Sequence, residues 1–215
     1  MLVTRIITGS MVWTVPLDWS NFNTIEVIGG GGGGGSFYRW DGGSRLVYGY
    51  GGSGAGYIRV ENLNLLVPGQ NIVVTVGFGG APAATPGMSG GGPGSPGGSS
   101  LFGSYLQATG GQTQQAFPFI RGGNGFINLP VGSYSNFLQS AGSSGGLYSG
   151  GSPGAGGLSG RPGFGNNGRG GNSQSFNNAN PLFGNVGVAQ QPGQPGVVVI
   201  SYTPSGTHQA SVWIS

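Results

Sequence analysis

The sequence of 215 residues contains no cysteine, so disulfide bonds and thiolate metal sites are excluded. Only 5% of its residues are charged, against about 25% in an ordinary globular domain. The basic residues are all arginines, and they are scattered without forming the cluster that nucleic-acid binding needs. No apolar run approaches the ~20 residues of a membrane span, and the N-terminus has no signal-peptide core. We therefore expect that the protein neither binds nucleic acid nor inserts into a membrane. We also expect that it is made in a cytoplasm.

Groups that could carry catalysis are also scarce. The only imidazole is that of His208, which lies in a polar segment near the C-terminus and is expected on the surface. The carboxylates are too few and too far apart to form an acid/base pair or a carboxylate metal site, and they are Asp18, Glu26, Asp41 and Glu61. We therefore expect no enzyme, no cofactor and no side-chain metal site.

Two glycine-rich patterns resemble catalytic or phosphate-binding motifs. Residues 87–91 match Gly-x-Ser-x-Gly, and Gly30, Gly32 and Gly35 match Gly-x-Gly-x-x-Gly after a strand-like run. The first motif needs a strand before it and a helix after it, and the second needs a helix directly after the loop. No segment has a helical period, and chance matches are expected at this glycine content. Both motifs are therefore rejected.

Glycine and proline are abundant, with 52 and 14 residues, but aromatics make up 11% of the chain, which argues against disorder. Glycine recurs at every third position in parts of residues 142–163 and in residues 91–97. Three residues per turn is the polyproline-II period, in which the backbone groups point outwards. We interpret these blocks as short polyglycine-II-type helices, packed side by side through backbone hydrogen bonds of about 1 kcal/mol each. The alternative is a flexible glycine/serine linker.

Alternating apolar residues predict β-structure in residues 3–28, 57–76 and 196–202. Glycine-rich helices and loops are expected in residues 29–56 and 77–195, within one domain of residues 1–202 followed by a tail at 203–215. The predicted fold class is all-β plus polyglycine-II, with essentially no α-helix. Strands from both ends of the chain would pair in a small β-sandwich or sheet and enclose the glycine-rich bundle.

Residues 29–35 are seven consecutive glycines, followed at once by a dense aromatic cluster. We interpret these glycines as the first rod of the bundle, a stiff spacer that presents the cluster. Segments rich in aromatic and amide residues interrupt the glycine background, and such segments on a rigid scaffold are typical of binding sites. The candidate binding residues are Phe37, Tyr38, Arg39, Trp40, Tyr48, Tyr50, Phe117, Phe119, Arg121, Tyr134, Phe137, Phe176 and Phe183.

Six short motifs follow one another along almost the whole chain. They are TGSMVWTVP (8–16), IEVIGGGGGGG (25–35), GGSGAGY (51–57), PGQNIVVTVG (68–77), GSSLFG (98–103) and GVVVISY (196–202). Each is weak alone, but their order resembles the glycine-rich domain of bacteriophage tail and tail-fibre proteins. The interrupted glycine blocks are also similar to the polyglycine-II adhesins of T-even phages. Unlike those adhesins, this chain opens with a β region instead of a fibre-attachment domain.

The resemblance implies a virion adhesion protein of a tail fibre or tail tip that recognises a host receptor without catalysis. Its implied partners are other tail or fibre proteins and a bacterial surface receptor, either an outer-membrane protein or a polysaccharide. The oligomeric state stays open between a homotrimer and a single self-sufficient chain. A purely structural virion protein, such as a fibre joint or capsid decoration, is the main alternative. Ice binding is a third class, which the bulky aromatics disfavour.

Overall fold

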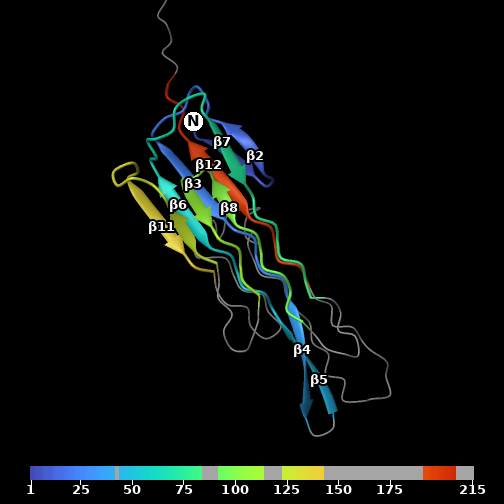
Figure 1. Cartoon of the computed structure of the whole chain (residues 1–215). Coiled ribbons are helices and arrows are strands. Elements are labelled where there is room, and N and C mark those ends of the chain that lie inside the picture. Colours follow the sequence, from blue (N-terminus) through green and yellow to red (C-terminus); the bar gives the residue numbers. More distant parts are fainter. Residues whose placement is uncertain (42–43, 84–91, 114–122, 143–190, 207–215) are drawn as a thin grey trace, which may run out of the picture.

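The computed structural model describes residues 1–41, 44–83, 92–113, 123–142 and 191–206. These residues form two five-stranded antiparallel sheets, a separate two-stranded sheet, and glycine-rich segments between them (Figure 1). No helix occurs in this part of the chain, so none there could cross a membrane. The predicted all-β class is therefore confirmed.

The first sheet joins strands from the two ends of the chain. Its strands, in spatial order, are β1 (Val3–Ile7), β12 (Val197–Tyr202), β3 (Asn23–Ile28), β6 (Tyr57–Glu61) and β11 (Asn136–Ser140). Strand β12 pairs on both sides, with Ile200 opposite Arg5 on β1 and opposite Ile25 on β3. The predicted pairing of N- and C-terminal strands is confirmed.

The second sheet faces the first and carries shorter strands. In spatial order they are β10 (Gly125–Ile127), β9 (Leu106–Ala108), β8 (Ser100–Phe102), β7 (Asn71–Thr75) and β2 (Met11–Thr14). Alternate side chains of both sheets meet in one core, with Ile25 and Val27 from the first sheet and Val74 and Phe102 from the second. The ring of Trp13 meets that of Trp19 edge-on at 5.6 Å between centroids. This aromatic contact joins strand β2 to the loop that follows it.

Several strands lie where the sequence predicted glycine-rich helices and loops. Strands β8, β9 and β10 have three residues each, which is too short for an alternating pattern to be recognised. Strand β11 reads Asn-Phe-Leu-Gln-Ser and has no β-branched residue. The remaining unpredicted strands are β4 (Gly35–Asp41) and β5 (Ser44–Tyr50), which pair only with each other in the described sheets. The prediction that residues 29–56 and 77–195 hold only glycine-rich helices and loops is therefore wrong for these six strands.

The glycine-rich segments continue the strands as rods that hydrogen-bond to one another. We call residues 29–34, 51–56, 77–83, 94–98, 109–112 and 191–196 the glycine rods. Each backbone N–H of residues 29–34 donates to a carbonyl of another rod, at 2.8–3.2 Å. Donors three residues apart meet the same neighbour, so 29 and 32 bond to 53–56, 30 and 33 to 95–98, and 31 and 34 to 191–194. This period of three is that of polyglycine II.

Rod 29–34 is the first of these rods in the chain, and it lies at the centre of the bundle. Its carbonyls also accept bonds, from Gly80 and Ala83 of one rod and from Gly111 of another. The rods that it contacts continue strands of both sheets. Hydrogen bonds therefore connect the two layers in the bundle, whereas the hydrophobic core connects them in the sandwich. The bundle extends from one end of the sandwich and is not enclosed by it (Figure 1).

Close backbone approach explains why these positions hold glycine. A Cβ atom built on Gly30 would lie 1.9 Å from the carbonyl oxygen of Phe78, and one on Gly33 would lie 2.0 Å from that of Ala81. Gly94 and Gly97, three residues apart, would both meet carbonyls of rod 29–34. The described glycines with positive φ lie outside the rods. The rods therefore require glycine for space, whereas a turn glycine such as Gly69 (φ +82°) requires it for conformation.

We expect Gly97→Ala to destabilise the protein strongly, because its Cβ would lie 2.0 Å from the carbonyl oxygen of Gly30. Such overpacking costs typically about 1–3 kcal/mol in the free energy of unfolding. The matched control is Gly9→Ala, where no atom lies within 4 Å of the new Cβ, and the change should stay within about 0.5 kcal/mol. Urea unfolding followed by tryptophan fluorescence measures both. Equal effects of the two substitutions would contradict the close-packed bundle.

A second prediction concerns Tyr202, whose hydroxyl donates to Asp18 Oδ1 at 3.1 Å. Burial raises the pKa of Tyr202, and so do the hydrogen bond and the charge of Asp18, while Arg5 opposes the shift. The folded protein therefore holds this proton more tightly than the unfolded chain, whose tyrosines titrate near about pH 10. The free energy of unfolding should fall as the pH rises above that value. Urea titrations at pH 8 and 11 should show a smaller fall in Tyr202→Phe, and an equal fall would refute the assignment.

Candidate functional site

Strands β4 and β5 form a hairpin directly after rod 29–34. Gly35 lies opposite Tyr50, Phe37 opposite Tyr48, and Asp41 opposite Ser44. The hairpin lies at the far end of the bundle from the N-terminus of the chain (Figure 1). The rod that leads to it is anchored by hydrogen bonds from every N–H of residues 29–34. The bundle therefore holds the base of the hairpin at a fixed distance from the sandwich.

The local sequence explains why a hairpin forms here. Residues 37–40 are aromatic apart from one arginine, and Leu46 and Val47 stand on the partner strand. Aromatic and β-branched residues favour pleated strands. The two strands are linked in sequence by Gly42 and Gly43, and a two-residue glycine link is a typical hairpin signal.

The hairpin brings together one group of the predicted binding residues. The register places Phe37, Arg39, Tyr48 and Tyr50 at positions of one sheet face, and Tyr38 and Trp40 at positions of the other. Sequence separation alone did not show that Tyr48 stands directly opposite Phe37. The backbone register therefore gathers six of the candidate residues on two paired strands.

Tyr134 and Phe137 form a second group at a different place. Their rings meet edge-on, with centroids 5.9 Å apart and an interplanar angle of 90°. Tyr134 precedes β11 and packs against the hydrophobic core, and Phe137 is 44% exposed on that strand. Both lie on the sandwich, so the structure does not bring them to the hairpin. The remaining candidates lie outside the described residues, and they are Phe117, Phe119, Arg121, Phe176 and Phe183.

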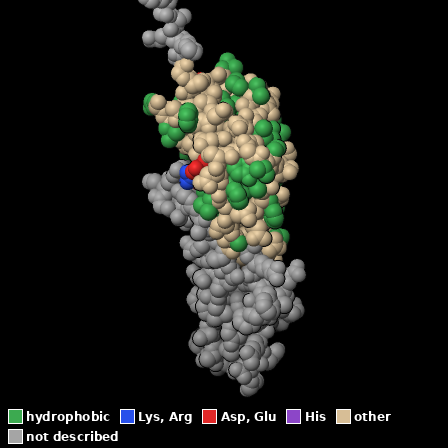
Figure 2. Space-filling model, turned by 90° about the vertical axis from the view of Figure 1, so that its left-hand side faces the viewer, with side chains coloured by type: hydrophobic (Ala, Val, Ile, Leu, Met, Phe, Trp, Pro, Cys, Tyr) green, Lys and Arg blue, Asp and Glu red, His purple; other side chains and the backbone are tan. Residues whose placement is uncertain are grey.

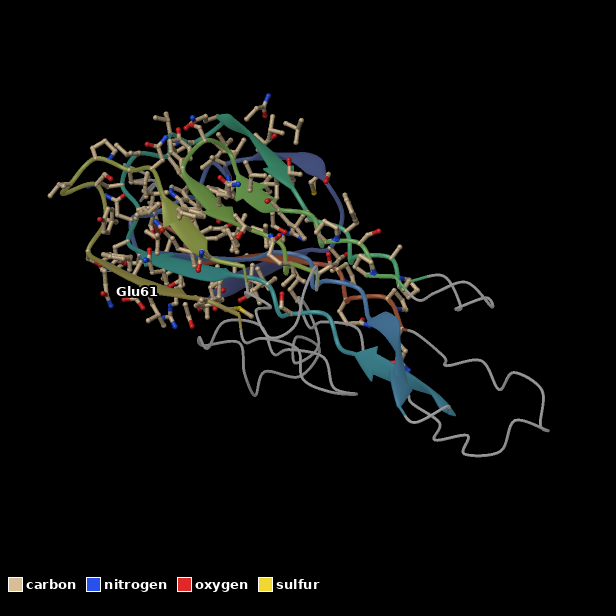
Figure 3. All side chains as sticks on the ribbon, turned by 60° about the horizontal axis from the view of Figure 1, so that its bottom comes forward. Glu61 is labelled. Carbon is tan, nitrogen blue, oxygen red and sulfur yellow. The ribbon has the colours of Figure 1, made fainter. Side chains whose placement is uncertain are left out.

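Three charged side chains of the first sheet are paired or buried, whereas Arg5 on β1 is exposed. Arg59 Nη2 lies 2.5 Å from Glu61 Oε1, at the end of strand β6 (Figure 3). Glu26 is buried on β3 and accepts a hydrogen bond from the Tyr57 hydroxyl at 2.8 Å. Figure 2 shows how few charged atoms this face of the described part carries. No group of three or more potential metal-binding side chains occurs among the described residues.

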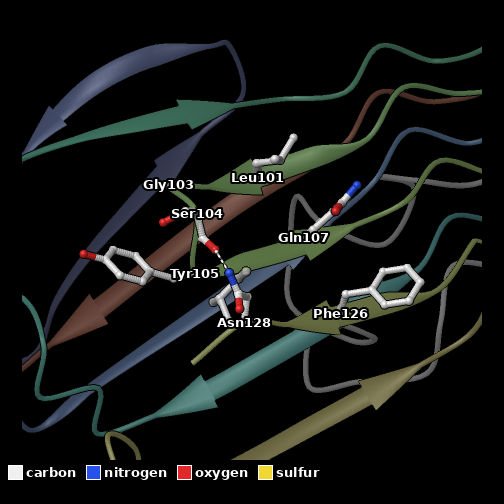
Figure 4. Close-up of a pocket in the computed structure, with 8 residues that line it drawn as sticks. Leu101, Gly103, Ser104, Tyr105, Gln107, Phe126 and Asn128 are labelled. Carbon is white, nitrogen blue, oxygen red and sulfur yellow. Dashed lines mark hydrogen bonds between the residues drawn. The ribbon is translucent and has the colours of Figure 1, made fainter. Parts of the chain in front are cut away.

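The sandwich also carries shallow hollows that sequence reasoning did not find. One of about 140 Å³ lies on the second sheet, beside Phe126 and the turn after β8, where the Asn128 amide donates to the Ser104 carbonyl oxygen at 3.2 Å (Figure 4). Another of about 430 Å³ is lined by residues 124–127 and 139–141. Phe126 and Gln139 line it together because β10 and β11, which follow one another in the chain, are neighbouring edge strands of the two sheets. No sequence signal marked this pair.

The described architecture predicts that the hairpin can be removed without unfolding the sandwich. The reason is that β4 and β5 pair with each other and belong to neither of the two five-stranded sheets of the described residues. Replacing residues 36–49 by a short glycine link should change stability by less than about 1 kcal/mol, which is about 2–4 °C in melting temperature. Calorimetry and near-ultraviolet circular dichroism of the core tryptophans measure this. Loss of the cooperative transition would show that the hairpin is part of the folding core.

Comparison with known proteins identifies the scaffold. The sequence model of a family described as "Glycine-rich domain" matches residues 5–203. A search of curated proteins finds no match. The matched range includes the strands of the sandwich, the glycine rods and the hairpin. This protein belongs to the glycine-rich domain family.

Proposed function

We propose that this protein is a phage adhesion protein of the virion tail fibre or tail tip, made in the host cytoplasm. It binds a bacterial surface receptor, an outer-membrane protein or a polysaccharide, without catalysing a reaction. The observation that carries this proposal is the aromatic hairpin β4–β5 at the end of a rigid rod, remote from the N-terminus (Figure 1). A receptor-binding element must reach past the particle, and this position suits it.

The chemistry of the hairpin supports recognition of a surface. Aromatic rings present apolar faces with little conformational entropy to lose, and they stack on sugar rings or on protein loops. An arginine between them can pair with phosphate or carboxylate groups. The sequence order of the six motifs further supports a phage tail protein, because it resembles the glycine-rich domain of such proteins.

The rod explains how binding on a glycine-rich element can be strong. A flexible linker would have to lose conformational freedom when its aromatic end binds, which weakens binding. The hydrogen bonds of residues 29–34 have already removed this freedom in the unbound protein. The base of the hairpin therefore meets its receptor in a fixed orientation.

A structural virion protein remains the second candidate, and the scarcity of charge favours it. Only 5% of the residues are charged, and surfaces buried in permanent assemblies are depleted in charge. In this case the hairpin contacts a neighbouring subunit. Gold labelling of the protein on particles, with adsorption and assembly measured separately, distinguishes the two roles.

We expect Tyr38→Ala and Trp40→Ala each to weaken binding of the purified protein to host cells by about tenfold or more, as central aromatic contacts do. The matched control is Phe78→Ala, because Phe78 is an exposed aromatic residue on a rod and not on the hairpin. Its substitution should leave cell binding unchanged. Undiminished binding in both hairpin variants would remove the hairpin from the proposal. Normal adsorption but failed particle assembly in those variants would favour the structural role.

A further inference from the structure

The loops at the end of the sandwich remote from the hairpin expose large apolar side chains. Val131 is 99% exposed, Leu17 86% and Phe22 74%. Leu65 and Val67, from the loop between β6 and β7, are exposed as well. We call these five side chains the apolar end surface. All five stand on loops at the same end of the sandwich, and large exposed apolar surfaces mark interaction sites.

This surface is held by an ordered framework. The loops at 15–22, 62–70, 128–135 and 203–206 are joined by backbone hydrogen bonds. These run from Val15 N–H to Gln70 (2.8 Å), from Asn64 N–H to Ser133 (3.0 Å) and from Thr203 N–H to Phe22 (2.9 Å). The buried Asn23 side chain adds bonds to Leu63 in both directions. The apolar side chains therefore cannot avoid water by collapse of their loops.

The four loops that carry this surface contain almost no charge. Asp18 is the only charged side chain in these four loops, and its Oδ1 accepts the hydrogen bond of Tyr202. An occupant of this surface should accordingly be apolar and uncharged, because a charged group there would lose hydration without gaining a partner.

The described chain ends beside this surface. Ser205 N–H donates to the Asp18 carbonyl oxygen at 2.8 Å, which places residues 205–206 next to Leu17 and close to Phe22. The sequence then continues as Thr-His-Gln-Ala-Ser-Val-Trp-Ile-Ser, residues 207–215. Val212, Trp213 and Ile214 form an apolar triplet without a charge or a glycine. The triplet is therefore apolar and uncharged, as an occupant of the surface should be.

We propose that Val212, Trp213 and Ile214 bind to the apolar end surface of their own chain. The linking residues 207–211 are long enough, since six residue steps from Gly206 to Val212 span up to about 20 Å. A tether of this length gives an effective concentration in the millimolar range, which favours the same chain over a second copy. This inference concerns the end opposite the hairpin and does not rest on the proposed function.

The absence of cysteine allows a direct test, because an introduced pair can form only one disulfide within a chain. In the full-length Leu17→Cys/Val212→Cys variant we expect a disulfide within one chain, formed at least tenfold faster than in a control pair. The control is Phe78→Cys/Val212→Cys, because Phe78 is similarly exposed (69%) but lies on a glycine rod. Mass spectrometry and non-reducing gels measure the bridge. Equal rates in the two pairs, or a bridge between two chains, would overturn the proposal.

A second measurement avoids engineered cysteines. Trp213→Ser should raise the fluorescence of a dye that binds exposed apolar surfaces several-fold, because the apolar end surface becomes free. Adding Phe22→Ser should remove most of that rise, whereas adding Phe78→Ser should not. Dye fluorescence that is unchanged by Trp213→Ser would show that the surface does not hold this triplet.

Discussion

Backbone hydrogen bonding between glycine rods is the interaction on which the shape of this protein depends. Within rod 29–34 every N–H finds a carbonyl on another rod, and donors three residues apart share a neighbour. The rods approach so closely that a Cβ atom on Gly30 or Gly97 would lie about 2 Å from a backbone oxygen. The entropic cost of ordering glycine is therefore offset by backbone hydrogen bonds, and at positions such as Gly30 and Gly97 the close approach leaves no room for a Cβ atom. The scarcity of side chains in the bundle is a condition of its stability.

Two kinds of interaction hold the layers of the molecule together, side-chain packing in the sandwich and backbone hydrogen bonds in the bundle. In the sandwich, hydrogen bonds run within each sheet, and a hydrophobic core with Phe102 and Trp13 joins the layers. In the bundle, hydrogen bonds themselves join the layers, since rod 29–34 bonds to rods that continue strands of both sheets. The change occurs where β3 ends at Ile28 and the glycines begin. The chain thus runs from β3, which is held by side-chain packing, into rod 29–34, which is held by backbone hydrogen bonds, and then into the hairpin.

The candidate site could be predicted in composition but not in arrangement. The run from Phe37 to Trp40 marked an aromatic element after the glycines, and the structure places it on β4. The opposition of Tyr48 to Phe37 depends on hairpin register, which the sequence suggests only through the Gly42–Gly43 link. Tyr134 met the same compositional criterion, but packs against the core of the sandwich. Composition does not distinguish an aromatic residue that binds a partner from one that fills a gap at the edge of a core.

By itself, the sequence determined the all-β class, because alternating apolar residues and the lack of a helical period are local properties. It only suggested the pairing of strands from the two chain ends, and its longest predicted three-residue glycine run, residues 142–163, lies almost entirely outside the described residues. Only the tertiary structure decided that rod 29–34 lies at the centre of the bundle and that the bundle extends the sandwich. It also decided that three-residue segments such as Leu106–Ala108 become strands. These outcomes depend on which backbone groups remain unpaired once the neighbouring strands are in place. That is a property of the assembled chain, which a local sequence pattern does not contain.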